Sequence, residues 1–292
     1  ELERCGVRIA HRVDADSEPR LFEQVCNSLL RGDARMGRVD DSLGGVMEDA
    51  IHFAERAAHT FDPDHRAIIM FTSGTTGKPK GAELTWTNLV EAAQASNRVL
   101  SPRSLSRGLW QAVLPFFHVG GFQVLVRSVC SRWSLRIYEG FDAAQVLRDA
   151  AELHATHISV VDKMLQDMVR HGGAALGAYQ CILLGGGPLN ANTVAQALAA
   201  KARVFASYGM TETSSQVANT LITSQFTGGL RLLPGYSARI VEPDAEGFGR
   251  LALRGPGVFG GYVNARAAFT VYGFFLTGDT AALHEGCRHV RE

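Results

Sequence analysis

Short β-rich runs alternate with helix-like stretches through the middle of the chain, and this alternation restricts the fold more than any other feature. His157–Val161 and Gln180–Leu184 are typical of buried strands, and Ala143–Leu153 spaces its apolar residues as one helical face does. Such alternation favours βα units and a largely parallel sheet. We therefore expect an α/β fold. The other strands expected are Ala67–Phe71, Leu109–Leu114, Leu135–Tyr138 and Ala202–Ser207, and the other helices are Leu84–Leu100, Lys163–Arg170 and Ala191–Ala200.

The pattern changes beyond about Thr227. Tyr236–Val241 and Arg250–Leu253 are strand candidates joined by a turn around Pro243–Gly249, and Asn264–Phe269 is a weak helix candidate. We expect residues 1–226 to form the α/β part of the chain and residues 227–292 to form a small β-rich subdomain.

Charge and cysteine content exclude several classes of protein. Lys plus Arg and Asp plus Glu both number 29 in 292 residues, without long runs of one sign, so no nucleic-acid groove or membrane patch is expected. No apolar run is long enough to span a bilayer. The five cysteines are scattered and form no metal-binding spacing, which predicts reduced thiols and a cytoplasmic location. They are Cys5, Cys26, Cys130, Cys181 and Cys287.

The most informative stretch is Phe71–Gly81, FTSGTTGKPKG, between an expected strand and an expected helix. Its small residues let the backbone fold around an anion, with N–H groups and hydroxyls donating to phosphate oxygens. It is not a Walker A loop, because Lys78 is followed by Pro79. A polar surface turn is the alternative for such a loop in isolation. The hydroxyls and ammonium groups belong to Thr72, Ser73, Thr75, Thr76, Lys78 and Lys80.

Four further motifs follow in chain order. They are LPFFHVGG at Leu114–Gly121, GGGP at Gly185–Pro188, SYGMTET at Ser207–Thr213 and FLTGD at Phe275–Asp279. A histidine beside aromatic rings can stack on or donate to a flat acid, and an aromatic face can bind a purine. A hydroxyl suits a phosphate oxygen, a glutamate suits Mg²⁺, and an aspartate can accept both hydroxyls of a ribose. Taken alone, GGGP is readily explained as a strand-to-helix turn without a ligand.

Together the five motifs resemble those of the adenylate-forming superfamily, which includes acyl-CoA synthetases, firefly luciferases and the adenylation domains of peptide synthetases. The resemblance covers about Ile69 to Asp279. It implies the layered α/β sheets of the superfamily's N-terminal domain, with residues 1–226 binding adenylate and acid and residues 227–292 ending near a hinge. Nucleotide contacts are implied for Thr72, Ser73, Gly74, Thr75, Thr76, Gly77, Lys78, Gly186, Gly187, Pro188, Tyr208, Gly209, Met210 and Asp279.

The resemblance also implies an ATP-dependent reaction that joins a carboxylic acid to coenzyme A through an acyl-adenylate. Catalytic roles fall on Lys80, His118, Thr211 and Glu212, with Glu212 as the Mg²⁺ ligand, and acid contacts fall on His118, Gly209 and Ser215. The segments Arg254–Val258 and Gly261–Asn264 match the superfamily's approach to TGD and are interpreted as scaffold. ATP, Mg²⁺, coenzyme A and a small carboxylic acid are the expected partners, and a homodimer stays open.

Details of GGGP, SYGMTETSSQ and FHVGG resemble the o-succinylbenzoate–CoA ligase subfamily of menaquinone biosynthesis, as does HISVVDKMLQ at His157–Gln166. Arg127 could offer a charge to the acid, and a helix-surface arginine is the alternative. A fatty-acid or aryl-acid CoA ligase and a catalytically silent nucleotide-binding module stay open as other functions. The superfamily's mobile C-terminal domain, which follows TGD, is expected to be absent, so the chain would be incomplete for full turnover.

Overall fold

The computed structural model describes residues 64–72, 79–101, 108–283 and 289–291, the last three by their backbone alone. All elements named below belong to one compact unit that contains residues 66–292.

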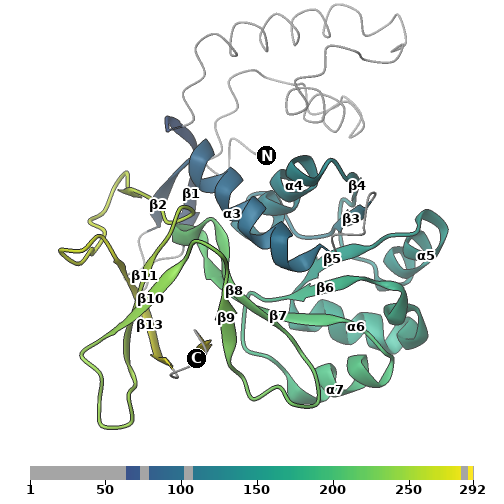
Figure 1. The fold of residues 1–292 in the computed structure, drawn as a ribbon. Coiled ribbons are helices and arrows are strands. Elements are labelled where there is room, and N and C mark those ends of the chain that lie inside the picture. The colour runs from purple at the N-terminus through teal and green to yellow at the C-terminus, as the bar shows by residue number, and fades with distance from the viewer. Residues whose placement is uncertain (1–63, 73–78, 102–107, 284–288, 292) are drawn as a thin grey trace, which may run out of the picture. The chain divides into compact units, whose positions relative to one another are not determined.

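A parallel sheet forms the centre of this unit, as the alternation of strands and helices predicts. Its strands lie in the order β4–β3–β5–β6–β7, and each neighbouring pair is parallel (Figure 1). The residues of β5 and β6 are buried throughout, as expected for strands covered on both faces. The bounds are β3 Leu109–Ala112, β4 Ser134–Ile137, β5 His157–Val160, β6 Cys181–Leu184 and β7 Val204–Met210.

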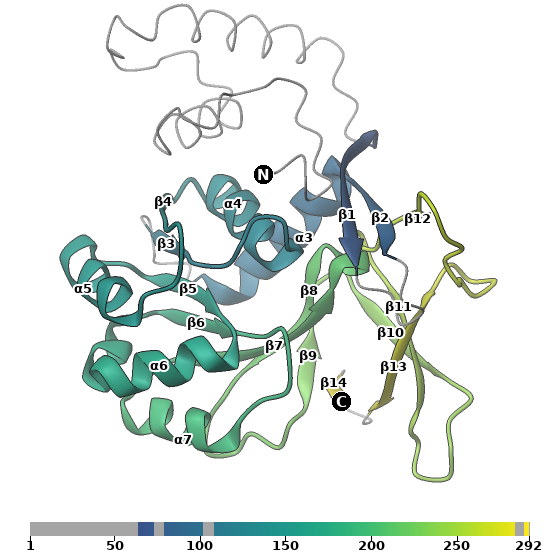
Figure 2. The same cartoon turned by 180° about the vertical axis from the view of Figure 1, so that it is seen from behind.

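Helices cover both faces of the parallel strands. α3 and α4 lie on one face, and α5, α6 and α7 lie on the other, as the two opposite views agree (Figures 1 and 2). The side chains of Asp142 and Asn190 cap the N-termini of α5 and α7. The bounds are α3 Trp86–Leu100, α4 Val119–Ser131, α5 Ala143–Leu153, α6 Asp162–Gly172 and α7 Ala191–Ala199.

Beyond β7 the sheet continues with strands that are all antiparallel to their neighbours. The hairpin of β10 and β11 is confirmed, with Ser237 paired to Arg254 and Val241 to Arg250. The division into residues 1–226 and 227–292 stays a prediction. The order from β7 outward is β8 Ser215–Leu221, β9 Leu230–Leu232, β14 His289–Arg291, β13 Phe275–Leu283, β11 Gly249–Arg254 and β10 Ser237–Val241.

The expected helix at Asn264–Phe269 is wrong. Its backbone is committed to other partners, because the N–H of Leu276 donates to the carbonyl of Ala268 and Phe269 forms a bridge with Phe275. These contacts tie the end of the segment to the start of β13, so local helical preference does not decide its conformation.

The loop predicted to bind phosphate, Thr72–Lys80 (the phosphate loop), also has a different setting from the one expected. It connects β1, Arg66–Thr72, to a strand, β2, Lys80–Thr85, and the two pair as an antiparallel hairpin. The following helix begins at Trp86 rather than at Leu84. Its N-cap is Thr85, whose side chain accepts a hydrogen bond from the N–H of Asn88. β2 is favoured because Ala82 and Leu84 are fully buried and because its other edge pairs with β12, Gly261–Tyr262.

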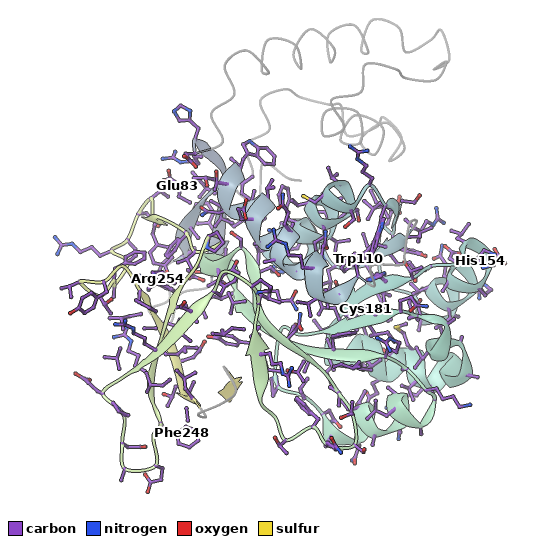
Figure 3. All side chains as sticks on the ribbon, viewed as in Figure 1. Glu83, Trp110, His154, Cys181, Phe248 and Arg254 are labelled. Atoms are coloured by element: carbon purple, nitrogen blue, oxygen red, sulfur yellow. The ribbon has the colours of Figure 1, made fainter. Side chains whose placement is uncertain are left out.

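Buried apolar side chains form three clusters around these sheets. One packs α5, α6 and α7 against the parallel strands, one lies around β1, β2 and α3, and one joins Trp110 on β3 to Cys181 on β6 (Figure 3). The clusters fix the strands whose carboxyl ends carry the motifs.

Candidate active site

A pocket of about 360 Å³ lies at the carboxyl ends of β3, β5, β6 and β7. Open α/β sheets place ligands at this edge, because the loops that follow parallel strands converge there. Its walls come from three of the five motifs and from α4 and β8. The lining residues are Leu114, Pro115, His118, Val119, Gly120, Gly121, Arg127, Ser159, Val160, Val161, Leu183, Gly185, Gly186, Ser207, Tyr208, Gly209, Ser215 and Gln216.

The SYGMTET motif shapes one wall through a close approach of two strands. At Gly209 the β7–β8 register shifts, and a Cβ there would overlap the carbonyl oxygen of Ser215, so only glycine fits. Ser214 and Ser215 both have positive φ, 54° and 85°. The Thr213 hydroxyl fastens this turn, since it lies 3.0 and 2.9 Å from the carbonyl oxygens of Met210 and Ser215. A turn held in a costly conformation at a pocket is typical of a binding site.

Three buried hydrogen-bonding atoms of the pocket lining have no partner within the described part of the chain. They are Arg127 Nε, Ser159 Oγ and Gln216 Nε2. Each can donate a hydrogen bond, and a buried donor left without a partner costs about 1–3 kcal/mol. The pocket is therefore built to accept a ligand that carries hydrogen-bond acceptors.

Arg127 is the most unusual of the three. It lies on α4, but the surface alternative considered for it is wrong, because its side chain is only 1% exposed. Burial lowers the pKa of its guanidinium to about 10, so it keeps its charge at neutral pH. Its guanidinium carbon lies 5.7 Å from the ring centroid of Trp110, and no carboxylate of the described residues pairs with it. A buried cation without a counter-charge points to an anionic ligand.

Tyr208 connects the pocket to the FLTGD motif. Its hydroxyl donates to Asp279 Oδ2 at 2.6 Å, across 71 residues of sequence. The hydroxyl of Thr277, buried beneath β11, accepts from the N–H of Asp279 at 3.1 Å. Asp279 itself is exposed and keeps one carboxylate oxygen available. The aromatic and the carboxylate predicted to bind one nucleoside thus lie together.

Glu212 lies two residues beyond β7 and is nearly buried, at 9% exposure. The hydroxyl of Tyr262 donates to Glu212 Oε1 at 2.6 Å, and the ammonium of Lys80 lies 5.6 Å from the centre of the Tyr262 ring. No cluster of three metal-ligating side chains exists among the described residues. A single glutamate nevertheless suits Mg²⁺, which takes one or two carboxylates and completes its shell with phosphate oxygens and water.

The other predicted residues fall at varied positions. His118 precedes α4, is exposed, and packs on Phe117 with ring centroids 4.5 Å apart. Gly186 lines the pocket with φ 82°, whereas Gly187 and Pro188 are exposed outside its lining. Thr72 and Lys80 pair across the β1–β2 hairpin, and Thr211 is half-buried before Glu212. Ser73, Gly74, Thr75, Thr76, Gly77 and Lys78 lie outside the described residues.

Sequence reasoning missed four residues of the site. Ser159 and Gln216 lie inside strands and resemble ordinary strand polar residues, although Gln216 stands in the SYGMTETSSQ string. The sequence predicts only a scaffold role for Tyr262 and Asn264, but they contact Glu212 and the end of the phosphate loop. Gly81 and Asn264 are 183 positions apart, so no local sequence pattern predicts that they lie together.

Known proteins resemble this chain over most of its length. The 2-succinylbenzoate–CoA ligase of Enterococcus faecalis is 34% identical over 234 residues, which cover 76% of this chain and 48% of that protein. The Staphylococcus aureus enzyme of the same name is 34% identical over 235 residues, covering 78% and 47%. A solved Bacillus subtilis o-succinylbenzoate CoA synthetase, in complex with the acyl-adenylate intermediate OSB-AMP, gives a TM-score of 0.72 at 30% identity and covers 79% of this chain and 49% of that one.

The chain thus spans about half the length of the curated relatives it matches. None of its described helices is long and apolar enough to cross a membrane. The family model described as AMP-binding enzyme matches residues 6–263, which include four of the five motifs in full. On this match, and on a fold shared with solved relatives, the chain belongs to the AMP-binding enzyme family.

Proposed function

We propose that this chain forms the nucleotide- and acid-binding part of an ATP-dependent acid–CoA ligase, and that its acid is 2-succinylbenzoate. The names of the relatives support the reaction, and a Bacillus subtilis relative has been solved with ATP and a magnesium ion. The choice of acid is carried by one observation, the unpaired donors of the pocket.

2-Succinylbenzoate has two carboxylates, one on the ring and one on the succinyl chain. Activation uses one of them and leaves the other as an anion inside the pocket. Arg127 supplies the counter-charge, and Ser159 and Gln216 supply further donors. A fatty acid or benzoate would spend its single carboxylate on activation, which would leave the buried guanidinium against an apolar group at high cost.

The nucleotide would lie between the pocket and β13. Tyr208 offers an aromatic face to adenine, Asp279 accepts from the ribose hydroxyls, and Thr211 donates to the α-phosphate. Residues Thr72–Lys80 would bind the β- and γ-phosphates. Mg²⁺, held by Glu212, would supply positive charge against the triphosphate.

The chemistry needs no general base, because a carboxylate is already a nucleophile at neutral pH. Its oxygen attacks the α-phosphorus, a new P–O bond forms, and the bond to the bridging β-oxygen breaks with release of pyrophosphate. The thiol of coenzyme A then attacks the acyl carbon, AMP leaves and the thiol proton passes to solvent. The protein's task in the first step is to bring two anions together, which requires fixed positive charge and in-line positioning.

Two finer expectations, a cytoplasmic location and a homodimer, remain part of this proposal. The cytoplasmic location rests on the scattered cysteines of the sequence. A homodimer stays a prediction, and the small-molecule partners follow from the proposed reaction.

Calorimetry with a panel of acids tests the choice of substrate. In the presence of a non-hydrolysable ATP analogue, 2-succinylbenzoate should bind at least about tenfold more tightly than benzoate or octanoate, because only it provides a second carboxylate for Arg127. Preference for octanoate or benzoate would remove the assignment of the acid. Addition of a relative's C-terminal part should restore thioester formation, and ATP binding without any turnover would indicate the silent module instead.

A further inference from the structure

The segment Gly261–Asn264, GYVN, carries contacts that a scaffold does not need. It lies beside β2 and reaches both Glu212 and the end of the phosphate loop. We propose that Tyr262 and Asn264 are positioning residues, which hold the carboxylate of Glu212 and the ammonium of Lys80 apart and in a fixed frame for the metal–triphosphate complex. The identity of that ligand rests on the proposed function, whereas the frame itself does not.

Tyr262 separates the two charges. Its hydroxyl binds Glu212 Oε1 at 2.6 Å while its ring faces the Lys80 ammonium at 5.6 Å. Lys80 and Glu212 form no ion pair among the described residues, although both contact the same side chain. Without the phenol, the Glu212 carboxylate would lose its partner and could turn to the Lys80 ammonium, and the two charges would have to separate again before a phosphate and a cation could bind.

Tyr262 is itself fixed from two sides. Its ring packs edge-on against Phe259, with centroids 4.8 Å apart, and its backbone pairs with Ala82 on β2. The N–H of Phe259 also donates to the carbonyl of Glu212 at 2.9 Å. Main chain and side chain of Glu212 are thus both tied to one short stretch, so the carboxylate is held before any ligand arrives.

Asn264 fixes the other charge through the backbone. Its Oδ1 accepts from the N–H of Gly81 and its Nδ2 donates to the carbonyl of Pro79, both at 2.9 Å. The N–H of Val263 donates to the carbonyl of Gly81, also at 2.9 Å. These three bonds enclose Lys80, the last residue of the phosphate loop and the first of β2. This clamp fixes the main chain at Lys80 and so the direction in which its side chain starts from the backbone.

The metal dependence of ATP binding tests the role of Tyr262. In the 292-residue chain, Tyr262→Phe keeps the ring over Lys80 and removes only the bond to Glu212. The apparent Mg²⁺ affinity of the ATP complex should fall about tenfold, as for loss of an outer-shell partner, while ATP affinity in EDTA stays as in wild type. Tyr272→Phe, which removes the hydroxyl of an exposed tyrosine, is the matched control and should change neither. Wild-type Mg²⁺ affinity in Tyr262→Phe would overturn the role of Tyr262.

Hydrogen exchange without any ligand tests the clamp. Asn264→Leu should speed exchange of the Gly81 amide more than Asn264→Asp does, because aspartate keeps the acceptor for that amide and loses only the donor to the Pro79 carbonyl. Asn192→Leu, at an exposed asparagine of α7, is the control. Unchanged protection of Gly81 in Asn264→Leu would overturn the clamp. If the wild-type chain bound ATP without any effect of Mg²⁺, the proposed function would fail, and exchange would still decide whether the clamp exists.

Discussion

Arg127 and His157, two buried basic side chains that lie at opposite edges of the parallel sheet, differ in their hydrogen-bond partners. At the carboxyl edge, Arg127, Ser159 and Gln216 face the pocket with atoms that lack partners among the described residues. At the amino edge, His157 begins β5, is fully buried between Trp110 and Trp133, and has a partner for each nitrogen. Its Nε2 lies 3.2 Å from the carbonyl oxygen of Leu100, so Nε2 carries the proton, and Nδ1 lies 2.9 Å from Thr156 Oγ1.

This difference indicates that Arg127 contributes to ligand binding, whereas His157 contributes to the stability of the fold. A histidine with both nitrogens engaged contributes to the fold and leaves nothing for a ligand. Unpaired donors lower the stability of the free protein and gain their partners only when a ligand binds. Substitutions at the carboxyl edge should therefore impair binding and spare the fold, and those at the amino edge should do the reverse.

The largest effect is expected from Arg127→Met. Methionine is unbranched and can occupy much of the buried space of the arginine side chain, but it carries no charge. Affinity for 2-succinylbenzoate should fall about 100-fold, as for loss of one partner of a buried charge pair. Thermal stability should be unchanged or higher, because the apolar side chain needs no counter-charge. Calorimetry and thermal unfolding measure the two quantities on the same sample.

A lower melting temperature together with unchanged acid affinity would contradict the assignment of Arg127 to the ligand. Arg148→Met, a change on α5 away from the pocket lining, serves as the control for loss of one positive charge.

At the amino edge, His157 should make stability depend on pH. Burial lowers its pKa from 6.5 to about 4. Between these values the unfolded chain binds a proton that the folded chain does not, so stability is fully present above pH 6.5 and is lost as the pH falls towards 4. The loss should reach about 3 kcal/mol, since each pKa unit corresponds to about 1.4 kcal/mol.

Denaturant unfolding at pH 7 and at pH 4.5 measures most of this loss, about 2 kcal/mol. His157→Gln keeps a donor for the Leu100 carbonyl but does not titrate, so it should reduce the pH dependence while leaving ATP affinity unchanged. His154→Asn, at an exposed residue after α5, should retain it in full. An equal pH dependence in His157→Gln and wild type would show that other groups govern acid stability.

Sequence reasoning succeeded where the signal was local. The βα alternation predicts the parallel strands and α5 to within a few residues, because burial on both faces gives continuous apolar runs. It failed where residues distant in sequence decide the local conformation. β2 forms a strand because β1 and β12 pair with it. Asn264 lies outside any helix because its side chain bonds to the backbone of Pro79 and Gly81. Arg127 illustrates the same limit, since nothing in a helix sequence shows that an arginine is buried beneath a pocket.

The smallest effect is expected at the bond between Tyr208 and Asp279, which joins the pocket to β13. Tyr208→Phe keeps the aromatic face and removes one hydrogen bond to a carboxylate, so ATP affinity should fall only about threefold to tenfold. Asp279→Ala removes the acceptor of the ribose hydroxyls as well and should weaken ATP more than Tyr208→Phe does. Affinity for 2′,3′-dideoxy-ATP should be nearly equal in wild type and Asp279→Ala, because that nucleotide has no hydroxyls to lose. If Asp279→Ala weakened both nucleotides equally, Asp279 would support the fold of β13 rather than bind ribose, and it would belong with His157 among the structural groups.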